Sequence, residues 1–169
     1  LPKHPIFRSN YEAKIRNFTY QFKTRTIGFV PFVVQGLNGS FSSGPKEFAL
    51  DFNNEGASIL WKEYDTIINL SASFKGVNYH TITIEERNYK IASHCYFEKT
   101  NRFVVLVYFL SYPHSRKITF DFITRNRCIV FFKECPNIQE PIDSLSPFLL
   151  PMVNKQINKM VVETLYSLV

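Results

Sequence analysis

The sequence predicts a mainly β protein, an antiparallel β-barrel or β-sandwich of about eight to ten strands with a C-terminal α-helix. Short apolar runs bounded by turn residues recur at roughly ten-residue spacing, which is typical of all-β folds. The 169-residue chain has 17 Phe and 9 Tyr against a single Trp, and aromatic residues favour strands. In the last segment the apolar residues are instead spaced three and four apart, which predicts a helix.

The strongest strand signal runs from Asn101 to Lys133. Three strands are predicted there, over 102–110, 117–124 and 128–133, with turns between them. In the first of the three, successive side chains point to opposite faces, and both faces are apolar. Such a strand must be covered on both sides, so we expect it at the centre of the sheet.

The rest of the chain divides around this block. Further strands are predicted over 18–23, 46–52, 57–64, 66–74, 79–86 and 89–98. Residues 27–37 are apolar but contain Pro31, which favours an edge strand or a bulge. The predicted organisation is a linker or edge segment over 1–10, an antiparallel β domain over 11–138, and a connector with an amphipathic helix over 139–169.

The C-terminal helix is predicted to begin at Ser146 and Pro147, with Ser as N-cap and Pro at the first helical position. Its apolar face contains Leu150, Val153, Ile157, Met160, Val161, Thr164, Leu165 and Leu168. We expect it to pack on the β domain or to cap a barrel mouth. A partner or membrane helix is the alternative, and the two lysines of its polar face, Lys155 and Lys159, argue against the membrane.

The formal net charge of +6 does not by itself indicate a partner. The basic residues are scattered over strand ends and turns without a run of five or six, so nucleic-acid binding is not expected. The chain begins with Leu1 and shows neither a signal peptide nor a long apolar stretch. We therefore expect a processed chain or an excised domain of a longer protein.

Three cysteines, Cys95, Cys128 and Cys135, have no C-x-x-C spacing, which supports neither a zinc ribbon nor a disulfide framework. Cys95 and Cys128 are expected as small buried hydrophobes within strands. A single bridge between Cys128 and Cys135 is the alternative, and the redox compartment stays open.

No catalytic or metal-binding constellation is predicted. Ser43 and Lys46 match the spacing S-x-x-K, but Gly44 and Pro45 between them do not form the helical turn that activates such a serine. The adjacent acids Glu85 and Glu86 are expected in a solvated loop.

The four histidines are His4, His80, His94 and His114. His94 and Cys95 are neighbours on a predicted strand and point to opposite faces, which argues against a shared metal or thiol site. The glycosylation-type triplets at Asn17, Asn38 and Asn69 do not establish secretion. The many aromatic side chains could line a ligand cavity, or they could fill the core.

Two parts of the sequence resemble a known module. The first part is Phe18-Thr19-Tyr20-Gln21-Phe22 with Gly28-Phe29, and the second runs from Thr100-Asn101-Arg102-Phe103 through Phe109 to Pro113. Both look like the β-rich, lipocalin-like C-terminal module that follows the catalytic domain of bacterial β-lactamase or penicillin-binding-protein-type serine hydrolases. The similarity covers about residues 11–138. The sequence departs from the module at two positions. The module's Asn before the Gly is replaced here by Thr or Arg, and its Trp is replaced by Cys95 or Tyr96.

This resemblance implies that the catalytic Ser, Lys and Tyr lie in an upstream domain of the same polypeptide, and no position here takes over their roles. The chain is then a non-catalytic accessory domain without cofactor or metal, located in the cell envelope or secreted if the parent is a penicillin-recognising hydrolase, and otherwise cytoplasmic. The alternative from the residues alone is a lipocalin-like protein that binds a small apolar ligand.

Overall fold

The computed structural model describes residues 8–23, 27–39, 42, 44–63 and 65–135, all within one compact unit of the chain. The helices are α1 (Glu12–Ile15) and α2 (Phe32–Leu37), and the strands are β1 (Thr19–Gln21), β2 (Pro45–Phe52), β3 (Gly56–Glu63), β4 (Thr66–Ser73), β5 (Asn78–Ile84), β6 (Arg87–Lys99), β7 (Arg102–Phe109), β8 (His114–Thr124) and β9 (Arg127–Cys135). Residues 1–7 of the linker or edge segment predicted over 1–10, and all of the connector and helix predicted over 139–169, lie outside the described residues.

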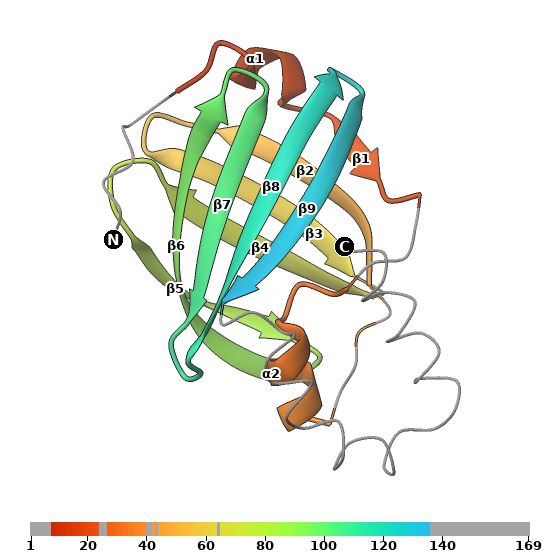
Figure 1. Ribbon diagram of the computed structural model, residues 1–169, viewed down its shortest axis with the longest axis vertical. Helices are drawn as coiled ribbons and strands as arrows, with labels where there is room; N and C mark the ends of the chain where they lie inside the picture. The colour runs from red at the N-terminus through yellow and green to blue at the C-terminus, as the bar shows by residue number, and fades with distance from the viewer. Residues whose placement is uncertain (1–7, 24–26, 40–41, 43, 64, 136–169) are drawn as a thin grey trace. The chain divides into compact units, whose positions relative to one another are not determined.

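The strands form one curved sheet that wraps into a nearly closed barrel (Figure 1). Its order is β1-β2-β3-β4-β6-β7-β8-β9, and β5 pairs with the first half of β6. Neighbouring strands are antiparallel apart from one parallel bridge between Ser73 of β4 and His94 of β6. The prediction of a mainly β, antiparallel barrel is therefore confirmed.

Strand β7 lies between β6 and β8, as expected for the strand with two apolar faces. Its inward side chains, from Phe103 to Phe109, are almost completely buried. Val104 points outward and is also 0% exposed. An ion pair between Lys117 of β8 and Glu98 of β6 crosses β7 diagonally at this level, so the aliphatic stem of the lysine can cover Val104.

Two turns show how the sequence ends its strands. Between β2 and β3, the Asn53 side chain accepts hydrogen bonds from the backbone N–H groups of Glu55 and Gly56. Gly56 is required because a Cβ there would lie 1.9 Å from the carbonyl oxygen of Ala72. Between β5 and β6, Glu85 and Glu86 both have positive φ, which is typical of a two-residue hairpin turn.

Two segments expected to be extended are helical. The predicted edge strand or bulge at 27–37 is wrong over its second half, because α2 occupies Phe32–Leu37 with Pro31 at its N-cap, where a missing N–H breaks no helical hydrogen bond. Of its apolar residues, Val34 is 0% exposed whereas Leu37 is 69% exposed, so α2 buries one face only. The β-pattern expected from Tyr11 begins only at β1, because α1 precedes it and buries Ile15.

Candidate functional site

The residues singled out in the sequence do not converge. Lys46 lies in strand β2, so it cannot sit one helical turn after residue 43, which is outside the described residues together with His4. The ring Nδ1 of His94 contacts the carbonyl oxygen of Gly76 at 2.8 Å on the outer face. Its neighbour Cys95 points inward and is 0% exposed, so the two side chains lie on opposite faces of β6, as expected.

The three cysteines are free thiols. The alternative of a Cys128–Cys135 bridge is wrong, because both residues lie on β9 and seven positions place them on opposite faces of one extended strand. Cys95 donates to the carbonyl oxygen of Ala72 at 3.2 Å, and burial raises the pKa of its thiol to about 12. Burial also raises the pKa of Cys128, which is half-buried rather than buried. A raised pKa makes these two thiols poor nucleophiles.

A cluster of buried charged side chains lies at the barrel end beside α2. Arg116 of β8 is 1% exposed and forms an ion pair with Glu134 of β9. Its guanidinium also donates to the carbonyl oxygens of Gly28 and Phe29, and it lies 5.4 Å from the ring centroid of Phe132. A buried charge is tolerated only with such partners.

A second carboxylate holds the same loop. Glu63 is 4% exposed and accepts hydrogen bonds from the Phe29 backbone N–H at 2.6 Å and from the Trp61 indole at 3.2 Å. Gly28 passes so close that a Cβ there would lie 2.2 Å from Glu63 Oε1. The contacts of this cluster are the Arg116–Glu134 ion pair and interactions with backbone groups of the 28–31 loop and with the rings of Trp61 and Phe132. The arrangement therefore anchors the 28–31 loop and α2 over the barrel end.

Sequence reasoning missed this cluster, although a signal existed. Arg116 directly precedes the strand predicted over 117–124. Extending the period-two alternation back by one residue places it on the same inward face as Ile118 and Phe120. Glu134 shares the parity of Phe132 and Val130 in the same way. A charged residue in phase with an apolar strand face predicts a buried ion pair.

The barrel interior is filled by aromatic rings that touch across opposite walls. Phe48 of β2 lies 4.9 Å, centroid to centroid, from Phe120 of β8. Phe52 of β2 lies 5.2 Å from Phe103 of β7 in an edge-to-face arrangement. These strands are separated by β3, β4 and β6 in the sheet order, so the contacts span the lumen. Such pairs stabilise a core beyond the apolar area they bury.

The outer surface carries a hollow of about 350 Å³ on β2, β3 and β4. It forms where the outward side chains are small, at Ala49, Ser58 and Ser71. Asp51 lines it and forms an ion pair with Arg16 at 3.0 Å. The carboxylate among its lining residues is therefore already neutralised.

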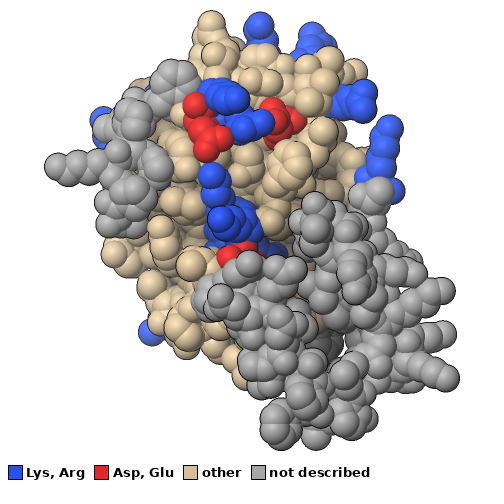
Figure 2. Space-filling model, in the orientation of Figure 1, with Lys and Arg blue, Asp and Glu red and all other residues tan. Residues whose placement is uncertain are grey.

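The outer face of β6 to β9 is more highly charged, and Figure 2 shows basic and acidic side chains side by side at its centre. Arg102 of β7 bridges Asp121 of β8 and Glu98 of β6, and Lys117 contacts Glu98 as well. Partial burial alone would raise the pKa of Glu98, but Lys117 and Arg102 outweigh it and lower that pKa. This network is balanced and leaves its acids paired.

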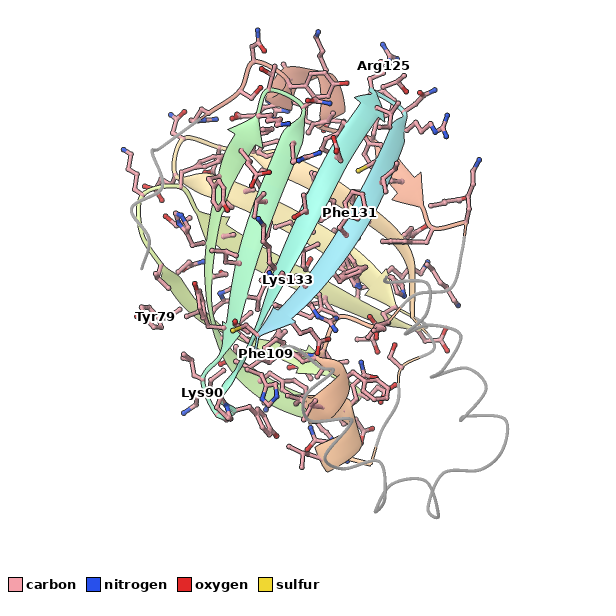
Figure 3. All side chains as sticks on the ribbon, viewed as in Figure 1. Tyr79, Lys90, Phe109, Arg125, Phe131 and Lys133 are labelled. Atoms are coloured by element: carbon pink, nitrogen blue, oxygen red, sulfur yellow. The ribbon has the colours of Figure 1, made fainter. Side chains whose placement is uncertain are left out.

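Beyond the network lies what we call the β9 strip: Arg127, Ile129, Phe131 and Lys133, which alternate along the outward face of β9. Ile129 is 43% exposed and Phe131 is 51% exposed. Figure 3 shows Phe131 and Lys133 along the strand and Arg125 at its turn. Within the described part of the chain, neither Arg127 nor Lys133 has an ion-pair partner. The strip is thus apolar at its centre and basic at both ends.

Searches for other kinds of site found none in the described ranges. No group of three or more His, Cys, Asp or Glu side chains there is arranged to hold a metal ion. Neither described helix has the length and apolar character needed to cross a bilayer. The chain matches no family model, no curated protein and no solved structure.

Proposed function

We propose that this chain is a non-catalytic β-barrel module that accompanies an upstream catalytic domain of the β-lactamase type in one polypeptide and acts by contact with it. One observation favours this function over that of a lipocalin-like ligand carrier. The rings of Phe48 and Phe120 meet across the lumen, which favours a structural core over a ligand cavity.

The other features agree with a module that works through its surface. The buried charges of Arg116 and Glu134 hold the chain's own loop, and the raised pKa of the Cys95 thiol argues against a role as nucleophile. The exposed apolar residues Ile129 and Phe131 lie together on one strand. Adjacent exposed apolar residues are a feature of interaction surfaces.

The test is to express the longer polypeptide and this chain separately and to treat both with a fluorescent penicillin and a chromogenic ester. Labelling or turnover by the longer polypeptide, with none by this chain, is the expected result. A longer polypeptide that neither is labelled nor turns over the ester would overturn the link to serine hydrolases.

The lipocalin-like alternative has its own test. Titration of the chain with a fluorescent fatty acid should give no saturable binding at one site, because a ligand would have to separate rings such as Phe52 and Phe103 that are in contact. Saturable binding with one ligand per chain, weakened by Phe120→Trp in the lumen, would favour the carrier.

A further inference from the structure

Among the described residues, the sheet ends at β9. This strand has nine residues and pairs with β8 alone among the described strands, whereas β1 at the other end of the sheet has three. The Tyr20 hydroxyl of β1 donates to the carbonyl oxygen of Arg125 at 2.6 Å, which links the two ends at the β8–β9 turn. From Ile129 onward, no described strand pairs with the free edge of β9.

Within the described part of the chain, the core is less well buried along the same edge. The inward residues Cys128, Val130 and Phe132 of β9 are only half-buried, while their partners on β8 are at most 1% exposed. One further strand beside β9 would cover them. An unpaired strand edge is also a template for strand addition, because its free backbone N–H and C=O groups bind an extended segment.

The charges of the β9 strip define what such a segment must contain. Arg127 and Lys133 point outward six residues apart, which is about 20 Å along a strand. Acidic residues directly opposite them would be favourable cross-strand pairs, and apolar residues between them would cover Ile129 and Phe131. A second copy of β9 fits badly, because antiparallel pairing centred on Val130 sets Arg127 opposite Lys133, with like charges together.

We propose that β9 accepts, as an additional strand, an extended acidic segment of another polypeptide domain, with acids at positions i and i+6 and apolar residues at i+2 and i+4. This inference deepens the proposed function and rests on it in one respect, that the module acts by contact with another domain. Main-chain hydrogen bonds supply the affinity, and the two acid–base pairs supply the preference.

The test uses the full chain and two peptides, acetyl-Glu-Val-Ile-Thr-Val-Val-Glu-amide and the same peptide with Lys in place of both Glu. Binding is measured by calorimetry, and the bound surface by hydrogen exchange followed by mass spectrometry. The acidic peptide is expected to slow exchange in 127–135 and to bind about tenfold more tightly than the Lys peptide. The variant Arg127→Glu/Lys133→Glu should reverse this preference, whereas the matched control Lys75→Glu/Lys90→Glu, two exposed lysines away from β9, should keep it.

Four results would overturn the proposal: no binding at millimolar peptide, equal binding of both peptides, a preference unchanged by the Arg127→Glu/Lys133→Glu variant, or protection of β9 by dimerisation without peptide. Equal protection by a single-stranded oligonucleotide would also overturn it, in favour of a general polyanion surface. The outcome is separable from that of the proposed function. Absence of penicillin labelling in the longer polypeptide would overturn the link to a serine hydrolase. The peptide preference is measured on this chain alone and tests only the edge of β9.

Discussion

Three inward-facing residues of β8 pair with three inward-facing residues of β9, and the residues of β9 are less buried than their partners. Phe122, Phe120 and Ile118 on β8 are 0–1% exposed, whereas the residues paired with them on β9 are partly exposed. Up to β8 the barrel buries its own apolar surface through rings that meet across the lumen. At β9 the same alternation continues, but β8 is its only paired neighbour among the described strands. The comparison separates a core that is complete from an edge that is not.

The largest effect should come from the complete region. Phe120→Ala removes a ring that contacts Phe48 and Phe103, and we expect it to lower the free energy of unfolding by about 4 kcal/mol. Phe131→Ala, on the outward face of β9, is the matched control and should cost less than about 1 kcal/mol. Urea unfolding measures both. Similar losses for the two variants would remove the distinction between core and edge.

A slightly smaller loss of stability is expected on breaking the Arg116–Glu134 ion pair, which joins β8 to β9. Arg116→Met leaves Glu134 buried without its partner and should cost about 3 kcal/mol. The double variant Arg116→Met/Glu134→Leu should recover most of this loss, because no uncompensated charge remains. Arg16→Met breaks an exposed pair with Asp51 and should cost less than about 1 kcal/mol. A double variant as unstable as the single one would mean that the contacts to the 28–31 loop, rather than the charge, dominate.

The buried thiol of Cys95 predicts a pH dependence. Its pKa is raised by burial from 9.0 to about 12 in the folded chain, so between these values the unfolded chain releases a proton that the folded chain keeps. The contribution of Cys95 to stability must then fall as pH rises above 9, by at most about 1.4 kcal/mol per pH unit, and the raised pKa of Cys128 adds a loss of the same sign. Urea unfolding between pH 8.5 and 10 should show this slope in the native chain and in Cys135→Ala, and a weaker slope in Cys95→Ala. An identical slope in Cys95→Ala would assign the effect to other groups.

The smallest effect on stability is expected on the β9 strip. Lys133→Glu has no described ion pair to break, and we expect a change of no more than about 0.5 kcal/mol in the free energy of unfolding. A substitution this mild that nevertheless changes peptide preference would assign the strip to recognition. A decrease of more than about 2 kcal/mol in the free energy of unfolding would instead indicate that Lys133 stabilises the fold.

Much of the barrel could be predicted from the sequence, because period-two alternation reports directly on a two-faced sheet. The alternation over 102–110 correctly placed β7 between two neighbouring strands, and the turn chemistry around Asn53 ended β2 where predicted. The strand predicted over 79–86 instead ends at Ile84, because Glu85 and Glu86 form the turn. The helix α2 was missed because its residues have strand propensity, and burial against the barrel end outweighs that preference.

Features that depend on how the strands pair could be predicted less well than the alternation within each strand. The Arg116–Glu134 pair joins residues 18 positions apart, and it depends on a register that no local pattern reveals. The open edge of β9 depends on which strand closes the barrel, and that follows from the three-residue length of β1. Alternation alone cannot distinguish an edge strand from one with two neighbours.

Hydrogen exchange of the free chain, resolved to single amides, tests the comparison most directly. In an antiparallel pair, alternate residues direct their N–H toward the partner and away from it. We therefore expect alternate amides of β9 from Ile129 to Cys135 to exchange rapidly, while the amides of β7 exchange only through global unfolding. Uniform protection along β9, equal to that of β7, would contradict the account, because the edge would then already be paired.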